Sequence, residues 1–488
     1  MTVAVPKTDA FGQLVVIDRL EVEVTRLEPD RMVAEYRVTA GGETDSTEFT
    51  YRYHEPVFDP ESPSDRNLAA MMAAQPALNY GLFCREIVLH GPLDNLDQRF
   101  LNNYAAHTAR EIYVNKFLMD NPFLTGSAAD MPAERRGSYL QAKLLFPDSE
   151  KAIATAWDTS TGRIAVLSSG GKDSLLSYGL LDEIADEVHP MFVNESGRHW
   201  FTAINAWRHF KDHIPHATRV WTNSDRLFVW MLSHLPFVRK DHARLRADIY
   251  PIRLWTVAVF LFGVLPLVRR RGIGRITIGN EFDSSVRLRH HGITHYGAVY
   301  DQSRWFDEAM TRYFQRKKWN LLQFSVLRPL SELLIEKVLV ERYPELQRLQ
   351  TSCHATHVDG DVARPCGKCE KCRRVVSMLV ALGADPTRCG YTPSQIDACL
   401  ADLTGQGVHQ EEASARHVLH MLTEQGHVEA GTRAHPYPEV LALRFDRERS
   451  PHETVPADLR QALYRLLLEH ADGAVERQGR LWVKTDPL

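Results

Sequence analysis

The sequence contains few cysteines and no hydrophobic run long enough to cross a membrane. Only 7 of its 488 residues are cysteine, too few for a disulfide-rich secreted scaffold. The longest apolar stretch, 254–268, is interrupted by Gly263 and Pro266 and is shorter than the ~18–20 residues that span a bilayer. We therefore expect a buried core helix over this stretch and no membrane partner.

Excess charge and an export signal are also missing. The 58 Lys and Arg residues nearly balance the 62 Asp and Glu residues, for a net charge of −4, so no overall basic field favours nucleic acid as a partner. Residues 1–7 do not begin a signal-peptide pattern, and we expect a cytoplasmic protein. With 44% hydrophobic and 25% charged residues, the chain has the composition of a folded globular protein, and its length corresponds to two to four domains.

Three regions differ in hydrophobic pattern, and together they predict an α/β fold. Residues 1–150 are expected to form an N-terminal α+β domain, with half-exposed antiparallel strands at 14–18, 31–38 and 48–53 and helices over 67–82 and 101–117. Residues 155–388 alternate short β-branched runs with helical segments, which indicates a parallel sheet with strands at 163–168, 188–193, 218–222, 275–279 and 321–327. Residues 389–488 are expected to form a small helical or winged-helix-like C-terminal module, with helices over 414–425 and 457–469.

A glycine-rich loop follows the first strand expected in the α/β region. Its residues are Ser169, Gly170, Gly171, Lys172, Asp173 and Ser174. Paired glycines let backbone N–H groups approach an anion closely, and the start of the following helix adds a favourable dipole. The serines supply hydroxyl donors, the lysine a positive charge, and the aspartate a carboxylate that orients Mg²⁺ or the loop itself. The spacing differs from that of a Walker A motif, so the loop predicts another class of phosphate site.

Polar residues follow three further expected strands of the parallel sheet. Ligands of such sheets bind at the carboxyl ends of the strands. Asn280, in the segment 278–285, is expected to face a nucleotide, and Arg328, in the segment 324–333, is expected to bind a phosphate or carboxylate with two donors. The segment 194–200 is a candidate for holding an adenine base or a substrate.

Four of the seven cysteines fall within 20 positions, namely Cys353, Cys366, Cys369 and Cys372. A C-x2-C-x2-C knuckle with a fourth cysteine a short loop away can surround one ion tetrahedrally, and the spacing predicts structural Zn²⁺. Four protein ligands would leave no open position for catalysis. An iron–sulfur cluster is the alternative, and a redox-active C-x-x-C pair is less favoured. The charge of a zinc tetrathiolate would be offset by Lys368, Lys371, Arg373 and Arg374.

The loop 169–174 resembles the pyrophosphate loop of the ATP pyrophosphatase (PP-loop) superfamily, whose members cleave ATP between the α and β phosphates. Together with the Arg-Pro-Leu segment and the cysteines, it resembles two groups: the ATP-dependent UDP-N-acetylmuramoyl-L-alanyl-L-glutamate epimerases and the 7-cyano-7-deazaguanine synthases. The epimerases are similar over the longer stretch, since they share an N-terminal α+β domain, the segment 324–333 and a Ser-Cys before the knuckle 366–372. The chain differs from the epimerase pattern over 287–300 and in its C-terminal tail.

The resemblance implies a PP-loop core, similar to adenine nucleotide alpha-hydrolases, that uses ATP, Mg²⁺ and Zn²⁺. It implies catalytic roles for Lys172, Asp173 and Arg328, and nucleotide contacts from the loop and Asn280. The epimerase reading implies that adenylation of the terminal L-Glu of UDP-N-acetylmuramoyl-L-Ala-L-Glu acidifies its α-proton, which a side-chain base removes on the way to D-Glu in peptidoglycan precursor synthesis. Candidates for that base are His290, His291, His295 and Asp301.

Two other functions stay open. A deazaguanine synthase-like enzyme would activate a carboxylate for attack by ammonia or another nucleophile. A zinc-stapled module that binds ATP without turnover would use the same loop as a sensor. The deazaguanine-type hypothesis also leaves room for a protein or nucleotide target. We expect a small anionic substrate, with the UDP-muramoyl dipeptide favoured, and no nucleic acid partner.

Overall fold

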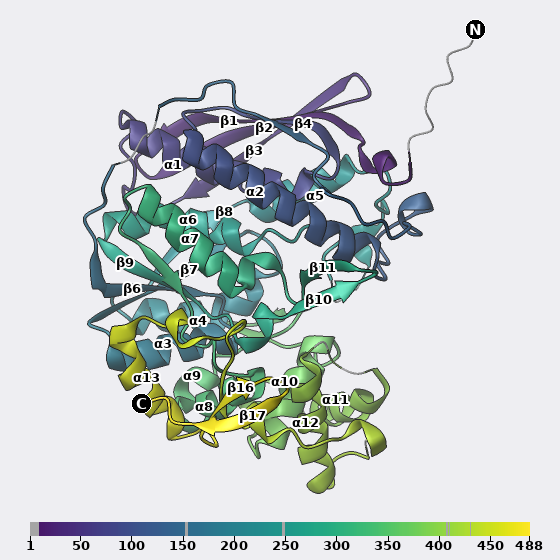
Figure 1. The fold of residues 1–488 in the computed structure, drawn as a ribbon, viewed down its shortest axis with the longest axis vertical. Coiled ribbons are helices and arrows are strands. Elements are labelled where there is room, and N and C mark those ends of the chain that lie inside the picture. The colour runs from purple at the N-terminus through teal and green to yellow at the C-terminus, as the bar shows by residue number, and fades with distance from the viewer. Residues whose placement is uncertain (1–8, 152–154, 246–248, 407, 409, 430) are drawn as a thin grey trace.

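The computed structural model describes residues 9–151, 155–245, 249–406, 408, 410–429 and 431–488. They include 13 α-helices and a ten-stranded sheet in the order β12-β9-β6-β7-β8-β3-β2-β1-β4-β5 (Figure 1). The fold is therefore α/β, as predicted, with a central sheet that is mostly parallel. None of the described helices has the length and apolar character needed to span a membrane. Residues 1–7, the basis of the prediction about export, lie outside the described residues.

The parallel half of the sheet is formed by five strands that alternate with helices along the chain. They are β6 (Ser160–Ser168), β7 (Glu187–Asn194), β8 (Thr218–Thr222), β9 (Ile273–Ile278) and β12 (Leu322–Phe324). All five predicted strands are present, but β12 is shorter than the predicted 321–327. It ends early because the Ser325 hydroxyl accepts the Leu327 N–H and draws the chain into a turn.

Helices cover both faces of this half-sheet. α3 (Lys172–Ile184) and α4 (Trp200–His213) pack on one face, and α6 (Val257–Arg270) and α7 (Arg304–Arg316) on the other (Figure 1). Side chains of β6 alternate between the two cores: Ile164 and Val166 lie with α3 and α4, and Ala165 lies with α6, as the pleat requires. α6 is the buried helix predicted from the longest apolar stretch.

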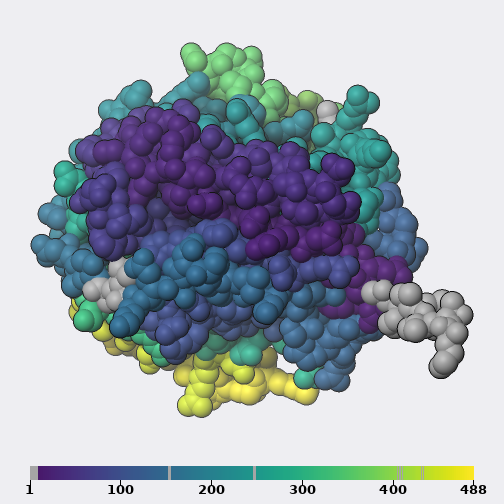
Figure 2. Space-filling view, turned by 90° about the horizontal axis from the view of Figure 1, so that it is seen from above, coloured from purple at the N-terminus to yellow at the C-terminus, as the bar shows by residue number. Residues whose placement is uncertain are grey.

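The N-terminal half of the sheet begins with the predicted antiparallel strands β1 (Ile17–Glu28), β2 (Arg31–Ala40) and β3 (Glu43–Arg52). β1 starts later than predicted because Gly12–Leu14 forms a 3-10 turn. On its other side β1 pairs in parallel with β4 (Cys84–Leu89), and β4 with β5 (Lys143–Leu145). Figure 2 shows this N-terminal part, in purple, spread over one end of the molecule.

One sheet joins the first two predicted domains. β3 pairs antiparallel with β8, and Tyr51 lies opposite Thr222. The helices α1 (Pro63–Ala74) and α2 (Asn95–Ile112) pack in the same core as α6. The division of the chain near residue 150 stays a prediction, and the described structure adds that the two parts share a sheet and a core.

A fully buried ion network ties α1 and α2 to the end of α7. Lys317 is 0% exposed, and its ammonium donates to Asp94 at 2.7 Å, Asn67 at 3.0 Å and Asp97 at 3.1 Å. Tyr313 donates to the other oxygen of Asp97 at 2.6 Å. The positive charge of Lys317 offsets the negative charges of Asp94 and Asp97, whose side chains are shielded from water.

We expect Lys317→Met to destabilise the protein by about 3–5 kcal/mol, because it leaves two buried carboxylates without their cation. Denaturant unfolding of the purified variant measures the loss. The matched control is Lys318→Met, since Lys318 is the next residue and is exposed; its unfolding midpoint should stay close to that of the wild type. Equal midpoints for the two variants would contradict this account of the network.

The C-terminal region returns to the α/β core and is not purely helical. α10 (Glu370–Ala381), α11 (Pro393–Gln406) and α12 (Glu412–Glu424) form a separate hydrophobic cluster. A three-stranded sheet of β15 (Leu443–Phe445), β16 (Ala474–Gln478) and β17 (Leu481–Thr485) packs with α13 (Ala457–Leu468) into the core around α3. Of the two predicted forms of this tail, the purely helical one does not describe these residues, because they include a three-stranded sheet.

Candidate functional site

The strand order reverses between β6 and β9, which are neighbours in the sheet but are separated in sequence by β7 and β8. In open α/β sheets, ligands bind outside the carboxyl ends of the strands at such a switch point. The glycine-rich loop follows β6, and Asn280 and Glu281 follow β9. The two segments touch: a Cβ at Gly279 would lie 2.9 Å from the backbone of Asp173. The topology therefore brings the predicted phosphate loop and the predicted nucleotide-facing segment together.

The loop takes a conformation that suits an anion. Gly170 has φ +74° and lies so close to α4 that a Cβ would come within 2.9 Å of the Thr202 carbonyl oxygen. Gly171 is the N-cap residue of α3 and has no side chain that could accept a hydrogen bond from the helix. The first N–H groups of α3 therefore face the loop without a side-chain acceptor at the N-cap. Ser174, expected to donate to a phosphate, instead donates to the Gly171 carbonyl at 3.0 Å and accepts the Ser169 N–H at 3.3 Å. Its hydroxyl thus holds the loop in shape.

Lys172 lies at the centre of a charge cluster. Its side chain is 6% exposed, and its ammonium is 2.7 Å from Asp173 and 3.5 Å from Glu332. Burial lowers the pKa of Lys172, but the negative charges of Asp173, Glu332 and Glu281 outweigh burial and raise it overall. Lys172 is therefore a fixed positive charge within the loop 169–174.

Glu281 is a carboxylate that titrates near neutral pH. Burial, followed by the negative charge of Asp173, raises its pKa to about 7. Above that pH the ionised group lies close to a second carboxylate, which is the arrangement that a divalent cation relieves.

The raised pKa predicts that Glu281 makes the protein less stable at higher pH. The folded protein binds this proton more tightly than the unfolded chain, so stability is lost as the pH rises from about 4.5 to about 7 and then levels off. Glu281→Gln should remove this loss, which we put at roughly 2 kcal/mol for a side chain that keeps some exposure. The measurement is denaturant unfolding at pH 5 and pH 8 without divalent cations. A stability difference between the two pH values that is equal in both proteins would contradict the assignment.

The side-chain amide of Asn280, which follows β9 at the switch point, has a hydrogen-bond donor without a partner among the described residues. Its backbone N–H donates to the Ser325 hydroxyl at 3.2 Å, and that hydroxyl donates back to the Asn280 carbonyl at 2.7 Å. The backbone is thus held on both sides, while the buried side-chain Nδ2 has no hydrogen-bond partner within the described structure. A buried amide without a partner requires an explanation, and a ligand at the switch point would supply one.

Arg328 lies in a different environment from the one predicted. It is 0% exposed and bonds Asp307 at 2.6 Å, the Ser284 hydroxyl at 2.7 Å and the Gln302 carbonyl at 2.9 Å. The carboxylate that it binds thus belongs to the chain itself. Arg328 holds the segment after β9 against α7, and any effect on a ligand would act through that segment.

The four candidate bases lie in or after a hairpin of β10 (Arg287–His290) and β11 (Ile293–Tyr296) that packs on α2. The His290 ring pairs with the Leu118 carbonyl, His291 has φ +48° at the turn, and the His295 ring pairs with the Tyr296 carbonyl. Asp301 accepts the N–H groups of Val257 and Ala258 at the start of α6. Within the described structure, no hydrogen bond joins these four residues to the loop 169–174.

The segment 194–200 begins at the same edge of the sheet as the loop 169–174. Ser168 of β6 pairs with Phe192 of β7, so Glu195 follows its strand at the same edge of the sheet. Glu195 is 2% exposed, and its Oε1 has no hydrogen-bond partner in the described part of the chain. Burial, followed by the charge of Asp225, raises the pKa of Glu195 to about 7. Glu195 lies in the segment predicted to hold an adenine base or a substrate, but no local pattern in the sequence distinguishes this carboxylate.

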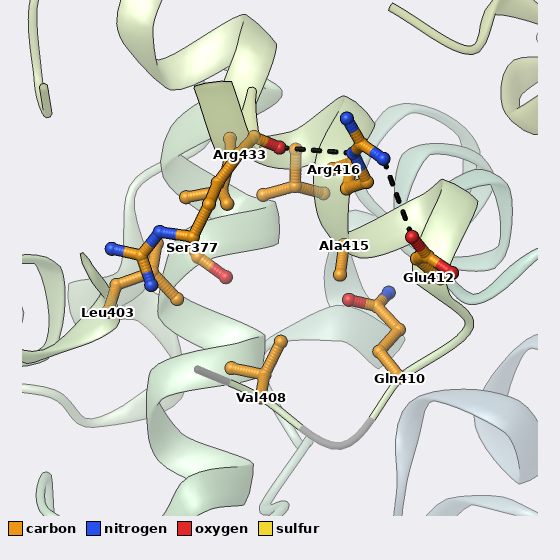
Figure 3. Close-up of a pocket in the computed structure, with 10 residues that line it drawn as sticks. Ser377, Leu403, Val408, Gln410, Glu412, Ala415, Arg416 and Arg433 are labelled. Carbon is orange, nitrogen blue, oxygen red and sulfur yellow. Dashed lines mark hydrogen bonds and ion pairs between the residues drawn. The ribbon is translucent and has the colours of Figure 1, made fainter. Parts of the chain in front are cut away.

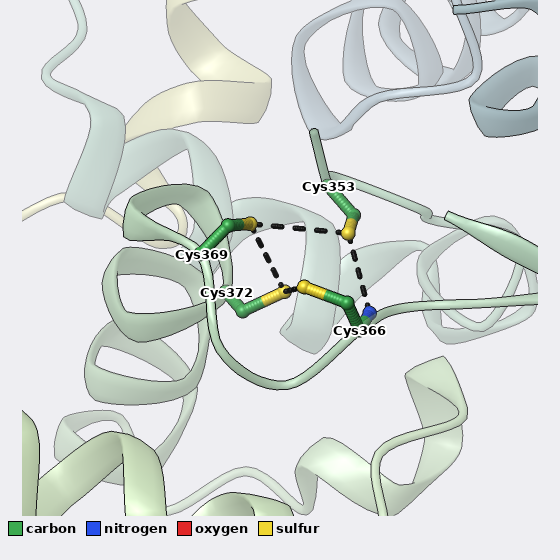
Figure 4. A group of neighbouring side chains, drawn as sticks. All are labelled: Cys353, Cys366, Cys369 and Cys372. Carbon is green, nitrogen blue, oxygen red and sulfur yellow. Dashed lines mark hydrogen bonds between the residues drawn. The ribbon is translucent and has the colours of Figure 1, made fainter. Parts of the chain in front are cut away.

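The four clustered cysteines converge, with their sulfur atoms turned toward one another (Figure 4). Sγ of Cys369 lies 3.4 Å from Sγ of Cys372 and 3.8 Å from that of Cys353, and Cys366 and Cys372 are 3.8 Å apart. Four sulfurs at ~2.3 Å from one Zn²⁺ in a tetrahedron are about 3.8 Å apart. Sγ of Cys353 also accepts the N–H groups of Ala355 and Cys366, each at 3.2 Å. The thiols can therefore hold a single metal ion such as Zn²⁺.

α10 connects the cysteine site to the charge cluster. Cys369 caps its start and Cys372 lies in its first turn. Arg374, two residues further, is 3.2 Å from Glu332, the residue that also contacts Lys172. Arg374 was expected to offset the charge of a zinc tetrathiolate, but it reaches the charge cluster instead. Residues two apart on a helix point in different directions, so Arg374 points away from Cys372. This spacing could have been recognised in the sequence.

Two cavities lie elsewhere in the described structure. One, of about 380 Å³, opens between α10, α11 and α12 beside Leu403, Val408 and Arg416 (Figure 3). The other, of about 400 Å³, lies between α7, β12 and the segment 451–460. Neither cavity is lined by the loop 169–174. We consider the switch point the better candidate site because charged groups from several elements converge there.

No protein-family model matches the sequence, and a search of curated proteins found no significant match.

Proposed function

We propose that the chain is an enzyme that transfers AMP from ATP to a carboxylate and releases pyrophosphate. The observation that carries the proposal is the charge cluster at the switch point. The fixed charge of Lys172 and the start of α3 suit the β and γ phosphates, and Arg374 adds a second cation beside Glu332. The free amide of Asn280 suits the nucleotide.

Mg²⁺, which accompanies ATP, fits the same cluster. Asp173 and Glu281 are close enough for the charge of one to raise the pKa of the other, and Mg²⁺ prefers such carboxylate oxygens. Asp173 and Glu281 would hold the ion. When bound, Mg²⁺ would offset the negative charge of the phosphates.

The chemistry follows from the weak reactivity of a carboxylate. A carboxylate oxygen of the substrate attacks the α-phosphorus of ATP; the bond from that phosphorus to the α,β-bridging oxygen breaks, and pyrophosphate leaves with the electron pair. Lys172 and the loop N–H groups stabilise the charge that develops on the leaving group. The product is an acyl adenylate, whose α-proton is more acidic than that of the free carboxylate.

Our preferred substrate is UDP-N-acetylmuramoyl-L-Ala-L-Glu, whose terminal L-Glu would be epimerised to D-Glu for peptidoglycan precursors. After adenylation a base removes the α-proton, a proton returns to the opposite face, and water cleaves the adenylate to AMP and product. The support is the resemblance in sequence, together with a chain long enough for parts on either side of the α/β core.

The experiment combines purified protein, ATP, Mg²⁺ and the UDP-muramoyl dipeptide in D₂O. We expect AMP, pyrophosphate and deuterium at the glutamate α-carbon, all dependent on the dipeptide. AMP formation that requires 7-carboxy-7-deazaguanine and ammonia would favour the deazaguanine alternative. Nucleotide binding without AMP or pyrophosphate for any of these substrates would favour the ATP sensor.

Glu195 is the carboxylate best suited to be the base in this proposal. It follows β7 beside the loop, has an unpartnered oxygen and has a pKa of about 7. Glu195→Gln should lower deuterium incorporation about 100-fold or more while AMP still forms. Mass spectrometry of the product measures the first effect and chromatography of the nucleotides the second. Unchanged deuterium incorporation would exclude Glu195 as the base.

A further inference from the structure

A second group of metal-ligating side chains lies at the end of the parallel sheet opposite the phosphate loop. It consists of Glu187 and His189 in β7 and His216, which precedes β8. One ligand atom of each lies within 4.8 Å of the others. Apart from the cysteine site, it is the one such group among the described residues.

The strands bring these residues together. Residues two apart on a strand point to the same face, so Glu187 and His189 share a face of β7. β7 and β8 are parallel, with Met191 opposite Thr218. Two residues before that pair, the same register places His189 beside His216, and their ring centroids are 4.7 Å apart.

Neighbouring groups hold the ligands in place and leave one nitrogen unsatisfied. Glu187 Oε1 lies 2.6 Å from His189 Nε2, while its Oε2 faces Arg163 Nε at 3.5 Å. The Arg271 guanidinium donates to the His216 carbonyl at 2.9 Å, which fixes the backbone at that ligand. His189 is 2% exposed, and its Nδ1 has no hydrogen-bond partner within the described residues.

We propose that Glu187, His189 and His216 bind a divalent transition-metal ion, in a site distinct from the cysteine site. Two imidazoles and one carboxylate suit Zn²⁺ and its first-row neighbours and leave room for water or a further ligand, whereas four thiolates do not. Such ligands lie about 2.0–2.2 Å from Zn²⁺ and roughly 3.3 Å from one another. An ion held by both Glu187 and His189 would lie between Oε1 and Nε2, so their 2.6 Å contact must widen on binding. A rotation of His216, which is exposed, can bring in the third ligand, and that exposure gives the ion a route to the site.

Metal stoichiometry tests the site without any assay of activity. After dialysis against micromolar Zn²⁺, we expect two Zn²⁺ per wild-type chain and one per His216→Ala chain. His216 is exposed, so its replacement should leave the thermal unfolding of the metal-free protein unchanged. The control is His427→Ala, because His427 is also exposed and lies outside the group; it should keep two Zn²⁺.

Co²⁺ distinguishes the two sites. Binding at the thiolates produces sulfur-to-cobalt charge-transfer absorption, whereas binding at the histidines adds only weak visible bands. His216→Ala should lose the weak bands and keep the charge-transfer band, and Glu187→Gln should weaken the second equivalent at least tenfold. One Zn²⁺ per wild-type chain, or two in His216→Ala, would overturn the proposal.

Discussion

Replacing Lys172 by alanine is expected to reduce pyrophosphate release at least 100-fold. Lys172 is the buried cation of the switch-point cluster, 2.7 Å from Asp173, and three carboxylates hold its pKa above the usual range. Removing a preorganised charge from a site where negative charge develops costs about 10²–10³ in rate. The measurement is pyrophosphate release with ATP, Mg²⁺ and the UDP-muramoyl dipeptide, together with calorimetric titration of ATP.

The fold of the Lys172 variant must be checked separately. Without the lysine, Asp173, Glu281 and Glu332 repel one another more strongly, so some loss of stability is expected; Lys172→Gln, which keeps most of the side-chain volume, limits it. Lys240→Ala is the matched control, because Lys240 is exposed and far along the chain from the loop. A folded Lys172 variant that releases pyrophosphate at the wild-type rate would exclude the loop from the reaction.

Replacing Cys369 by alanine is expected to have the largest effect on stability. Structural Zn²⁺ binds thiolate sites with apparent free energies of about 10–16 kcal/mol, and in such sites that energy contributes to folding. Loss of one ligand should lower the amount of Zn²⁺ bound at the cysteine site. It should also lower the unfolding temperature of the C-terminal region by about 10 °C or more. Metal analysis and calorimetry measure the two effects.

The same variant links the metal to the proposed reaction. Cys369 and Cys372 begin α10, and Arg374 on that helix reaches Glu332 beside Lys172. Pyrophosphate release should therefore fall with zinc content. Cys84→Ala is the control, because Cys84 is buried in the core around β4 and should keep both zinc and turnover. Unaltered zinc content and melting in Cys369→Ala would contradict a metal role for the four thiols.

Much of the fold was predictable because its signals are local. Short β-branched runs marked β6 to β9, and the glycine pair marked the sharp turn before α3. The predicted length of β12 was too great, since the turn at Ser325 depends on a hydrogen bond to Asn280, which is 45 residues away in sequence. The strands β15 to β17 were not predicted one by one because each is only three to five residues long, too short to show a period. β15 and β16 pack on the α3 core, which is formed by residues distant in sequence.

The candidate site divides in the same way. The loop 169–174 and the four cysteines were identified from spacing alone, because both depend on residues that are neighbours along the chain. Spacing could not place Arg328, which looked like a phosphate ligand but is held by Asp307 in α7. It also could not select among 22 histidines, since the role of a base depends on the groups that surround it.

Local patterns in the chain were enough to predict the α/β class, the glycine-rich turn before α3 and the cluster of four cysteines. Only the tertiary structure decided which distant groups share the site: Glu281 after β9, Glu332 at the start of α8 (Glu332–Arg342) and Arg374 in α10. The physical reason is that charge acts through space. Lys172 is fixed as a cation by carboxylates as far as 160 residues away in sequence, and no local pattern records which of them the sheet brings within reach.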